Sequence, residues 1–156
     1  MSRKRGRFLA PFAMAALLIS TVTLTPRTGG ASMEDALRNA RRIAAGIQQR
    51  FSNVQVSPVV YKGYLARGDM TVISVVLQAG VHYFLIGAGC GDCYDLDLVL
   101  VDENNNLIDR DVLTDAVPVV QVTPRWTGEF RIGVKMANSS ADGAHWVLLT
   151  AMTASD

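Results

Sequence analysis

The chain has 156 residues, of which 49% are hydrophobic and 19% charged, and its formal net charge is +1. This length suits one domain with its own hydrophobic core. Residues 1–31 hold five of the 15 Lys and Arg residues and no acid, so the rest carries ten basic residues against 14 acidic ones. That acidic balance excludes a typical nucleic-acid binder, which presents a basic surface.

Residues 1–31 have the layout of a secretory signal peptide. A basic start is followed by an apolar run from Phe8 to Leu24, and a Gly-Gly-Ala segment ends at Ala31. We expect cleavage after Ala31 and ordinary export, to the periplasm, the outer surface or the medium, because the segment has no twin arginine and no lipoprotein cysteine. The apolar run is at the short limit for a membrane span, so an uncleaved signal anchor is the alternative.

Residues 32–51 are expected to form an amphipathic helix, with Ser32 as N-cap and Asp35 completing a capping-box-like pair. Apolar side chains recur at helical spacing on one stripe, and arginines lie on the outward face. The stripe is Met33, Leu37, Ala40, Ala44, Ile47 and Phe51, and the outward face carries Arg38, Arg41 and Arg42. Either the helix packs against its own domain, or these residues bind a partner or a membrane surface.

From Pro58 onward the sequence predicts short strands. Leu96, Leu98 and Leu100 alternate with other residues, as in a half-buried strand, and residues 102–106 and 124–128 carry turn signals. About seven such strands, with no helical pattern between them, favour a mainly β fold: an antiparallel, jelly-roll-like β-sandwich over residues 58–153. Since every expected strand follows the helix, we expect the strands to close a core alone.

Several short segments of these strands resemble the bacterial pre-peptidase C-terminal domain. They are Leu-Gln-Ala-Gly-Val-His-Tyr at 77–83, Cys-Gly-Asp-Cys-Tyr-Asp-Leu-Asp-Leu-Val-Leu at 90–100, Val-Thr-Pro at 122–124 and Thr-Gly-Glu-Phe at 127–130. The resemblance covers roughly residues 60–153. It implies an exported, non-catalytic accessory β-sandwich of a kind sometimes linked to binding of carbohydrate or protein surfaces. Unlike many relatives of this subtype, residues 138–143 contain no second cysteine pair.

Cys90 and Cys93 are most simply a structural disulfide in an exported protein. A redox pair is a second reading, although that chemistry needs the first cysteine at a helix N-terminus and a strand follows here. A metal site is the third, and it would need more ligands than His82 and His145 supply.

Residues 92–115 contain eight acids and one base, Arg110. Asp95 and Asp97 share one strand face near Asp92, and carboxylate oxygens suit hard cations, so these three aspartates are candidate Ca²⁺ ligands. The alternative is a solvated acidic face that keeps the strands soluble. Calcium is the one cofactor that the sequence leaves open.

Catalysis has little support in this sequence. It contains no G-x-S-x-G nucleophile motif, and a small hydrolase using Asp95 and Asp97 is the remote alternative. Trp126 and Trp146 suit sugar stacking, but such residues more often fill the core or rim of a sandwich. We therefore expect an exported binding or structural module, such as an accessory subunit of an envelope or extracellular complex, with a protein or cell-envelope partner. Carbohydrate is an alternative ligand, and membrane contact is expected only through the basic helix or an uncleaved signal segment.

Overall fold

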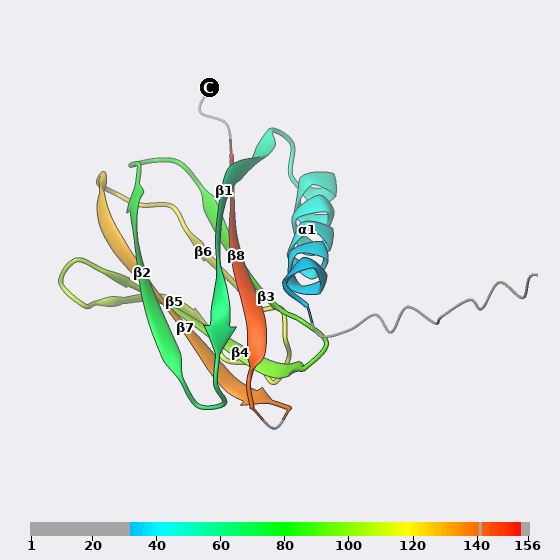
Figure 1. Cartoon of the computed structure of the whole chain (residues 1–156). Helices are drawn as coiled ribbons and strands as arrows, with labels where there is room; N and C mark the ends of the chain where they lie inside the picture. Colours follow the sequence, from blue (N-terminus) through cyan, green and yellow to red (C-terminus); the bar gives the residue numbers. More distant parts are fainter. Residues whose placement is uncertain (1–31, 141, 154–156) are drawn as a thin grey trace, which may run out of the picture.

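Eight strands form two packed four-stranded antiparallel sheets, and one helix lies against the outside of the first sheet (Figure 1). The computed structural model describes residues 32–140 and 142–153, so the predicted signal peptide lies outside the described residues. The elements are α1 (Met33–Arg50), β1 (Val54–Leu65), β2 (Met70–Leu77), β3 (Tyr83–Gly89), β4 (Cys93–Asp102), β5 (Leu107–Asp111), β6 (Val119–Val122), β7 (Gly128–Ser139) and β8 (Ala144–Thr153). No helix among the described residues is long and apolar enough to cross a membrane.

The strand orders are β1-β8-β3-β6 in one sheet and β2-β7-β4-β5 in the other. This is the arrangement of a jelly roll, so the expected antiparallel sandwich with an N-terminal helix is confirmed. The alternation in β4 and β7 has the predicted cause, because their apolar side chains point into the space between the sheets. Leu98 stands opposite Val134 in the register, and both are fully buried.

Strands β3 and β8 lack this alternation because both of their faces are covered. Every residue of β3 is buried, and so are residues 146–149 of β8. The second sheet covers one face of these strands, and the helix packs against β3, β8 and β1 on the other. The sequence of a strand that is covered on both faces is a continuous run of apolar residues, without alternation.

The first strand begins at Val54, earlier than the predicted start of the sandwich at Pro58. The start of this strand was missed because of Pro58, since proline has no N–H to donate to a sheet ladder and argues against a strand. In the structure it lies inside β1, at the register shift between Val56 and Val60, and β1 is an edge strand. An edge strand tolerates the missing N–H at such an irregularity. The short, charged strand β5 was likewise not expected.

The helix packs against its own domain, which is the first of the two alternatives that the sequence left open. Ala36, Ala40 and Ala44 are buried in the core, and small side chains at these positions let the helix axis come close to the sheet. Asn39 Nδ2 donates to the backbone oxygen of Gly89 at 3.0 Å, and Asp35 Oδ2 accepts from the N–H of Gly91 at 3.0 Å. This packing argues against the expectation that the strands close a core alone.

Candidate functional site: a groove between the helix and β6

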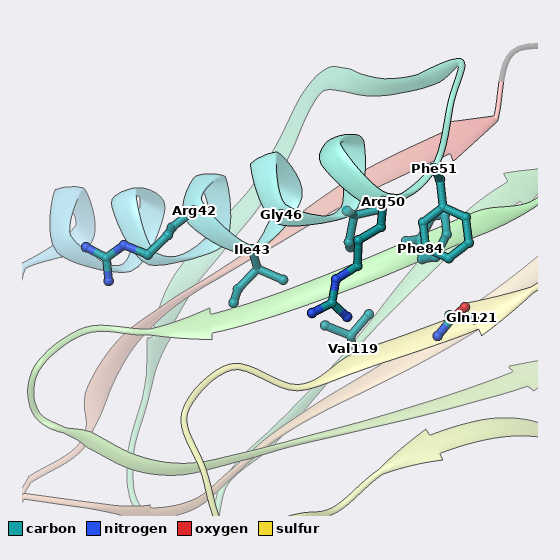
Figure 2. Close-up of a pocket in the computed structure, with 9 residues that line it drawn as sticks. Arg42, Ile43, Gly46, Arg50, Phe51, Phe84, Val119 and Gln121 are labelled. Atoms are coloured by element: carbon teal, nitrogen blue, oxygen red, sulfur yellow. The ribbon is translucent and has the colours of Figure 1, made fainter.

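A groove with a cavity of about 410 Å³ runs between the C-terminal half of α1 and the neighbouring sheet edge (Figure 2). Its walls come from three separate parts of the chain: the helix, the buried strand β3 and the edge strand β6. The lining residues are Arg42, Ile43, Gly46, Ile47, Arg50, Phe51, Phe84, Val119 and Gln121. We call this cavity the helix–β6 groove.

The floor of the helix–β6 groove is aromatic and apolar. The ring of Phe51 lies 5.1 Å from that of Phe84 at an interplanar angle of 49°. Phe51 follows the last helical residue, Arg50, and its extended backbone (φ −120°) ends the helix one residue earlier than predicted. It is therefore the C-cap, and its side chain stays exposed rather than closing the helical stripe.

A third ring packs beside the two phenylalanine rings of the floor. The imidazole of His82 packs edge-on against Phe84, with ring centroids 4.6 Å apart. His82 Nδ1 lies 2.7 Å from Thr123 Oγ1, and His82 Nε2 lies 3.3 Å from Gln121 Oε1. These contacts hold Gln121 at the rim of the groove, on the β6 side.

Two guanidinium groups border the helix–β6 groove on the helix side. Arg42 and Arg50 are exposed, and Figure 2 shows Arg50 reaching from the helix toward Val119. Within the described part of the chain, the one ion pair joins Arg38 to Asp35 at 2.8 Å, so neither groove arginine has an acidic partner there. The groove therefore combines unneutralised positive charge with an apolar floor.

The β6 wall is held in place by carboxylates of the acidic segment 92–115. Asp109 Oδ2 accepts from the N–H of Gln121 at 2.7 Å, and Asp111 Oδ2 accepts from the N–H of Val119 at 2.9 Å. The N–H groups of these two residues point away from β3, toward the open side of β6. Without the aspartates, a further strand on that side would be needed to accept these hydrogen bonds. The two aspartates thus replace a strand partner along the outer edge of β6.

Other acids of this segment organise turns. Asp102 accepts from the N–H groups of Asn104 and Asn106 and from Asn106 Nδ2, each at 2.8 Å. The side-chain hydrogen bond from Asn106 is the main cause that lowers the pKa of the Asp102 carboxyl. Asp115 Oδ1 accepts from the N–H of Val117 at 2.8 Å. Much of the acidic cluster therefore satisfies backbone donors, a role that the sequence did not suggest.

The predicted calcium ligands stay a prediction, and the structure shows how their side chains lie. Asp95 and Asp97 lie on the outer face of β4, and desolvation, helped by the charge of Asp95, raises the pKa of Asp97. Asp95 Oδ1 is buried and has no hydrogen-bond partner. Over residues 32–140 and 142–153, however, no three His, Cys, Asp or Glu side chains come together as a metal site. Calcium binding by Asp92, Asp95 and Asp97 would therefore need further oxygen ligands, from backbone carbonyls or water.

Cys90 and Cys93 are both buried, at the tight turn between β3 and β4, where the N–H of Cys93 donates to the carbonyl of Cys90 at 2.9 Å. They are free thiols in the structure. Burial raises the pKa of the Cys93 thiol to about 11, so the reduced form stays protonated at neutral pH and is a poor nucleophile. The attacking thiol of a C-x-x-C redox pair is the first cysteine, so the pKa of Cys93 does not decide between the redox and the disulfide interpretations, and both stay predictions.

Thiol labelling tests that disulfide. We expect exported protein, unfolded without reductant, to show no free thiol, because an oxidising compartment favours closure of the short loop between the two cysteines. A reduced and unfolded sample is the control, and both cysteines should label there. Full labelling without reductant would show that the two cysteines are free thiols in the exported protein and would contradict the disulfide.

The structure divides the predicted partner-binding residues into three groups. Arg42, Ile47 and Phe51 line the helix–β6 groove, whereas Met33 and Leu37 pack against the domain's own core. Arg38 is paired with Asp35 and Arg41 is exposed outside the groove. Sequence reasoning missed six lining residues, of which Arg50 and Ile43 could have been found by extending the helical stripe to its neighbouring positions. The six are Ile43, Gly46, Arg50, Phe84, Val119 and Gln121.

No family model and no curated protein matches the chain in sequence. Solved structures that are similar to it include the following two. A periplasmic inhibitor of g-type lysozyme from Aeromonas hydrophila is 17% identical, with a TM-score of 0.43, and the match covers 61% of this chain and 83% of that one. The pre-peptidase C-terminal domain of a collagenase from Bacillus anthracis is 16% identical, with a TM-score of 0.43, over 59% of this chain and 87% of that one. The second belongs to the family whose strand motifs the sequence resembles.

Proposed function

We propose that this protein is an exported, non-catalytic binding module that holds an acidic, partly apolar segment of a protein partner in the helix–β6 groove. One observation carries the proposal: Arg42 and Arg50, without acidic partners among the described residues, flank an apolar floor on which the Phe51 ring is exposed and packs against the buried Phe84. Planar guanidinium groups bind carboxylates in bidentate geometry, which suits aspartate and glutamate side chains.

The charge distribution supports an acidic partner at this place. Outside residues 1–31 the chain is acidic overall, so the two groove arginines stand out against a negative background. Complementary potentials of this kind steer a partner to one patch and repel it elsewhere. Exposed ion pairs are each worth only about 0–1 kcal/mol, so burial of an apolar partner side chain on Phe51 must supply most of the affinity.

A protein segment suits the described surface better than a sugar. Trp146 is only 5% exposed and cannot stack on a ligand. Trp126 is 39% exposed, but its ring stacks on Phe130 at 5.7 Å, and its Nε1 donates to Glu103 Oε2 at 3.2 Å. Of the two tryptophans, one is therefore buried and the other has one ring face covered by Phe130 and its N–H occupied.

Synthetic peptides test this proposal. Fluorescent peptides with Asp or Glu flanking Leu or Phe should bind the protein, and the same peptides with Lys in place of the acids should not. The double variant Arg42→Ala/Arg50→Ala should weaken binding of the acidic peptides by about tenfold or more, which equals about 1.4 kcal/mol, and should reduce its salt dependence.

Arg41→Ala is the matched control, since Arg41 is an exposed arginine of the same helix that does not line the groove. Its affinity should stay within about twofold of the parent protein, because an exposed charge outside the contact contributes little. Equal binding of acidic and basic peptides, or an equal loss in Arg41→Ala, would contradict the proposal.

A further inference from the structure

The two sheets have four edges, and three of them are protected against pairing with another chain. Edge strand β1 carries Pro58 at its register shift, and both outward N–H groups of β6 are occupied by aspartates. Edge strand β5 is five residues long and includes Asp109, Arg110 and Asp111. Proline, short length, charge and covered donors are the usual devices that prevent edge-to-edge association.

The fourth edge, β2, has none of these devices. Its eight residues, Met-Thr-Val-Ile-Ser-Val-Val-Leu, include no charge and no proline, and their register with β7 has no irregularity. Among the described strands, β7 is the sole partner of β2. Half of the backbone N–H and C=O groups of an edge strand point outward, so β2 offers an uninterrupted row of them.

The side chains beside this edge are apolar as well. Met70, Val72 and Val76 are exposed on β2. Met70 and Val72 also border a shallow cavity of about 250 Å³ on the outer face of the sheet, where Gly133 leaves space beside Val99. Backbone groups and apolar surface therefore coincide along β2.

We propose that β2 pairs antiparallel with β2 of a second copy of this chain, around a two-fold axis, so that two four-stranded sheets become one continuous sheet. With Ser74 on the axis, every residue of β2 faces one that points to the same side of the sheet, as strand pairing requires. The contact is isologous and closed, which gives a dimer rather than a fibre.

The distribution of charge favours a second copy as the occupant. A two-fold axis places each strand opposite itself, and the uncharged β2 brings no like charges together. The acidic residues of segment 92–115 belong to β4, β5 and the following loops, and the sheet order β2-β7-β4-β5 puts β5 at the far edge from β2. Two copies joined through β2 thus keep their acidic edges outermost.

The pairing leaves the helix–β6 groove open. In the first sheet, β6 and β1 are the two opposite edges. Strand β1 lies near β2, since residues of both strands line one cavity, so β2 is on the side of the sandwich away from β6. A dimer through β2 would carry two outward grooves, and a partner with two acidic segments would gain avidity from them. The dimer itself stands independently of what the grooves bind.

Light scattering during gel filtration measures the oligomeric state of the exported protein. We expect a mass twice that of one chain, falling to one chain on dilution. Val72→Lys should give a monomer at every concentration, because it places two ammonium groups in the paired edge. Val112→Lys is the matched control: Val112 is 51% exposed against 55% for Val72, but it follows β5 at the far edge, and this variant should remain a dimer.

Val72→Lys could lose the dimer simply because it misfolds, so a second variant that changes the side chain very little is also tested. Ser74→Cys lies on the proposed axis and faces its own copy, so mild oxidation should link two chains covalently, whereas Val112→Cys should not link. A parent protein that stays monomeric at the highest concentration, or a Val112→Lys variant that dissociates as completely as Val72→Lys, overturns the proposal. So does equal cross-linking of the two cysteine variants.

Discussion

Removal of residues 33–51 is expected to unfold the protein rather than release a free sandwich. The helix covers the outer face of β3 and of the central part of β8, which are buried on both sides, and three of its four alanines belong to the core. Without the helix, this apolar face would meet water at a cost of about 25 cal/mol for each Å² exposed. Far-UV circular dichroism and thermal melting of the truncated chain measure the outcome.

A point substitution isolates the same contact. Ala40→Glu places a carboxylate at a fully buried position between helix and sheet and should lower the free energy of unfolding by about 3 kcal/mol or more. Ala45→Glu, on the exposed face of the same helix, should change it by less than about 0.5 kcal/mol. A truncated chain that melts cooperatively, or equal effects of the two substitutions, would restore the interpretation of the helix as an appended attachment device.

The double substitution Asp109→Ala/Asp111→Ala is expected to loosen β6 and the groove wall together. Each carboxylate accepts an outward N–H of β6, and a hydrogen bond to a charged group contributes about 1.5–3 kcal/mol. The pair should therefore lower the free energy of unfolding by about 3 kcal/mol, measured by urea denaturation. Hydrogen exchange at the amides of Val119 and Gln121 should accelerate at the same time.

Two further variants separate hydrogen bonding from loss of charge. Asp109→Asn/Asp111→Asn keeps an acceptor oxygen at each position and should retain most of the stability. Asp69→Ala removes an exposed acid from the turn before β2 and should have little effect. If the asparagine pair is as unstable as the alanine pair, the carboxylates act through charge and not as acceptors for β6.

Local sequence patterns predicted much of this fold because their causes are local. The spacing of Leu96, Leu98 and Leu100 reports the pleat of one strand, and Ser32 marks the helix start through its own hydrogen bond with the N–H of Asp35. The turn after β4 was predicted from its Asn-rich composition, and Asn105 there has a positive φ of 65°. Each of these features depends on residues within a few positions of one another.

Predictions that depended on the environment of a residue were less complete. The acidic residues of segment 92–115 were interpreted as a solvated face or a calcium site, whereas Asp109 and Asp111 bind a strand that follows about ten residues later. The start of β1 was missed since a proline is acceptable in a strand only at an edge or irregularity, and edges are defined by the assembled sheet.

By itself, the sequence determined the helix, most strands, the face of each alternating strand and the sandwich class, because periodicity and turn chemistry are properties of the local backbone. Only the tertiary structure decided which surface the helix covers, that Arg42 and Arg50 meet Phe84 and Val119 in one groove, and that β2 is the unprotected edge. These features join residues far apart in the chain. Their proximity follows from the packing of two sheets and a helix around a shared core, and no spacing within a single segment records it.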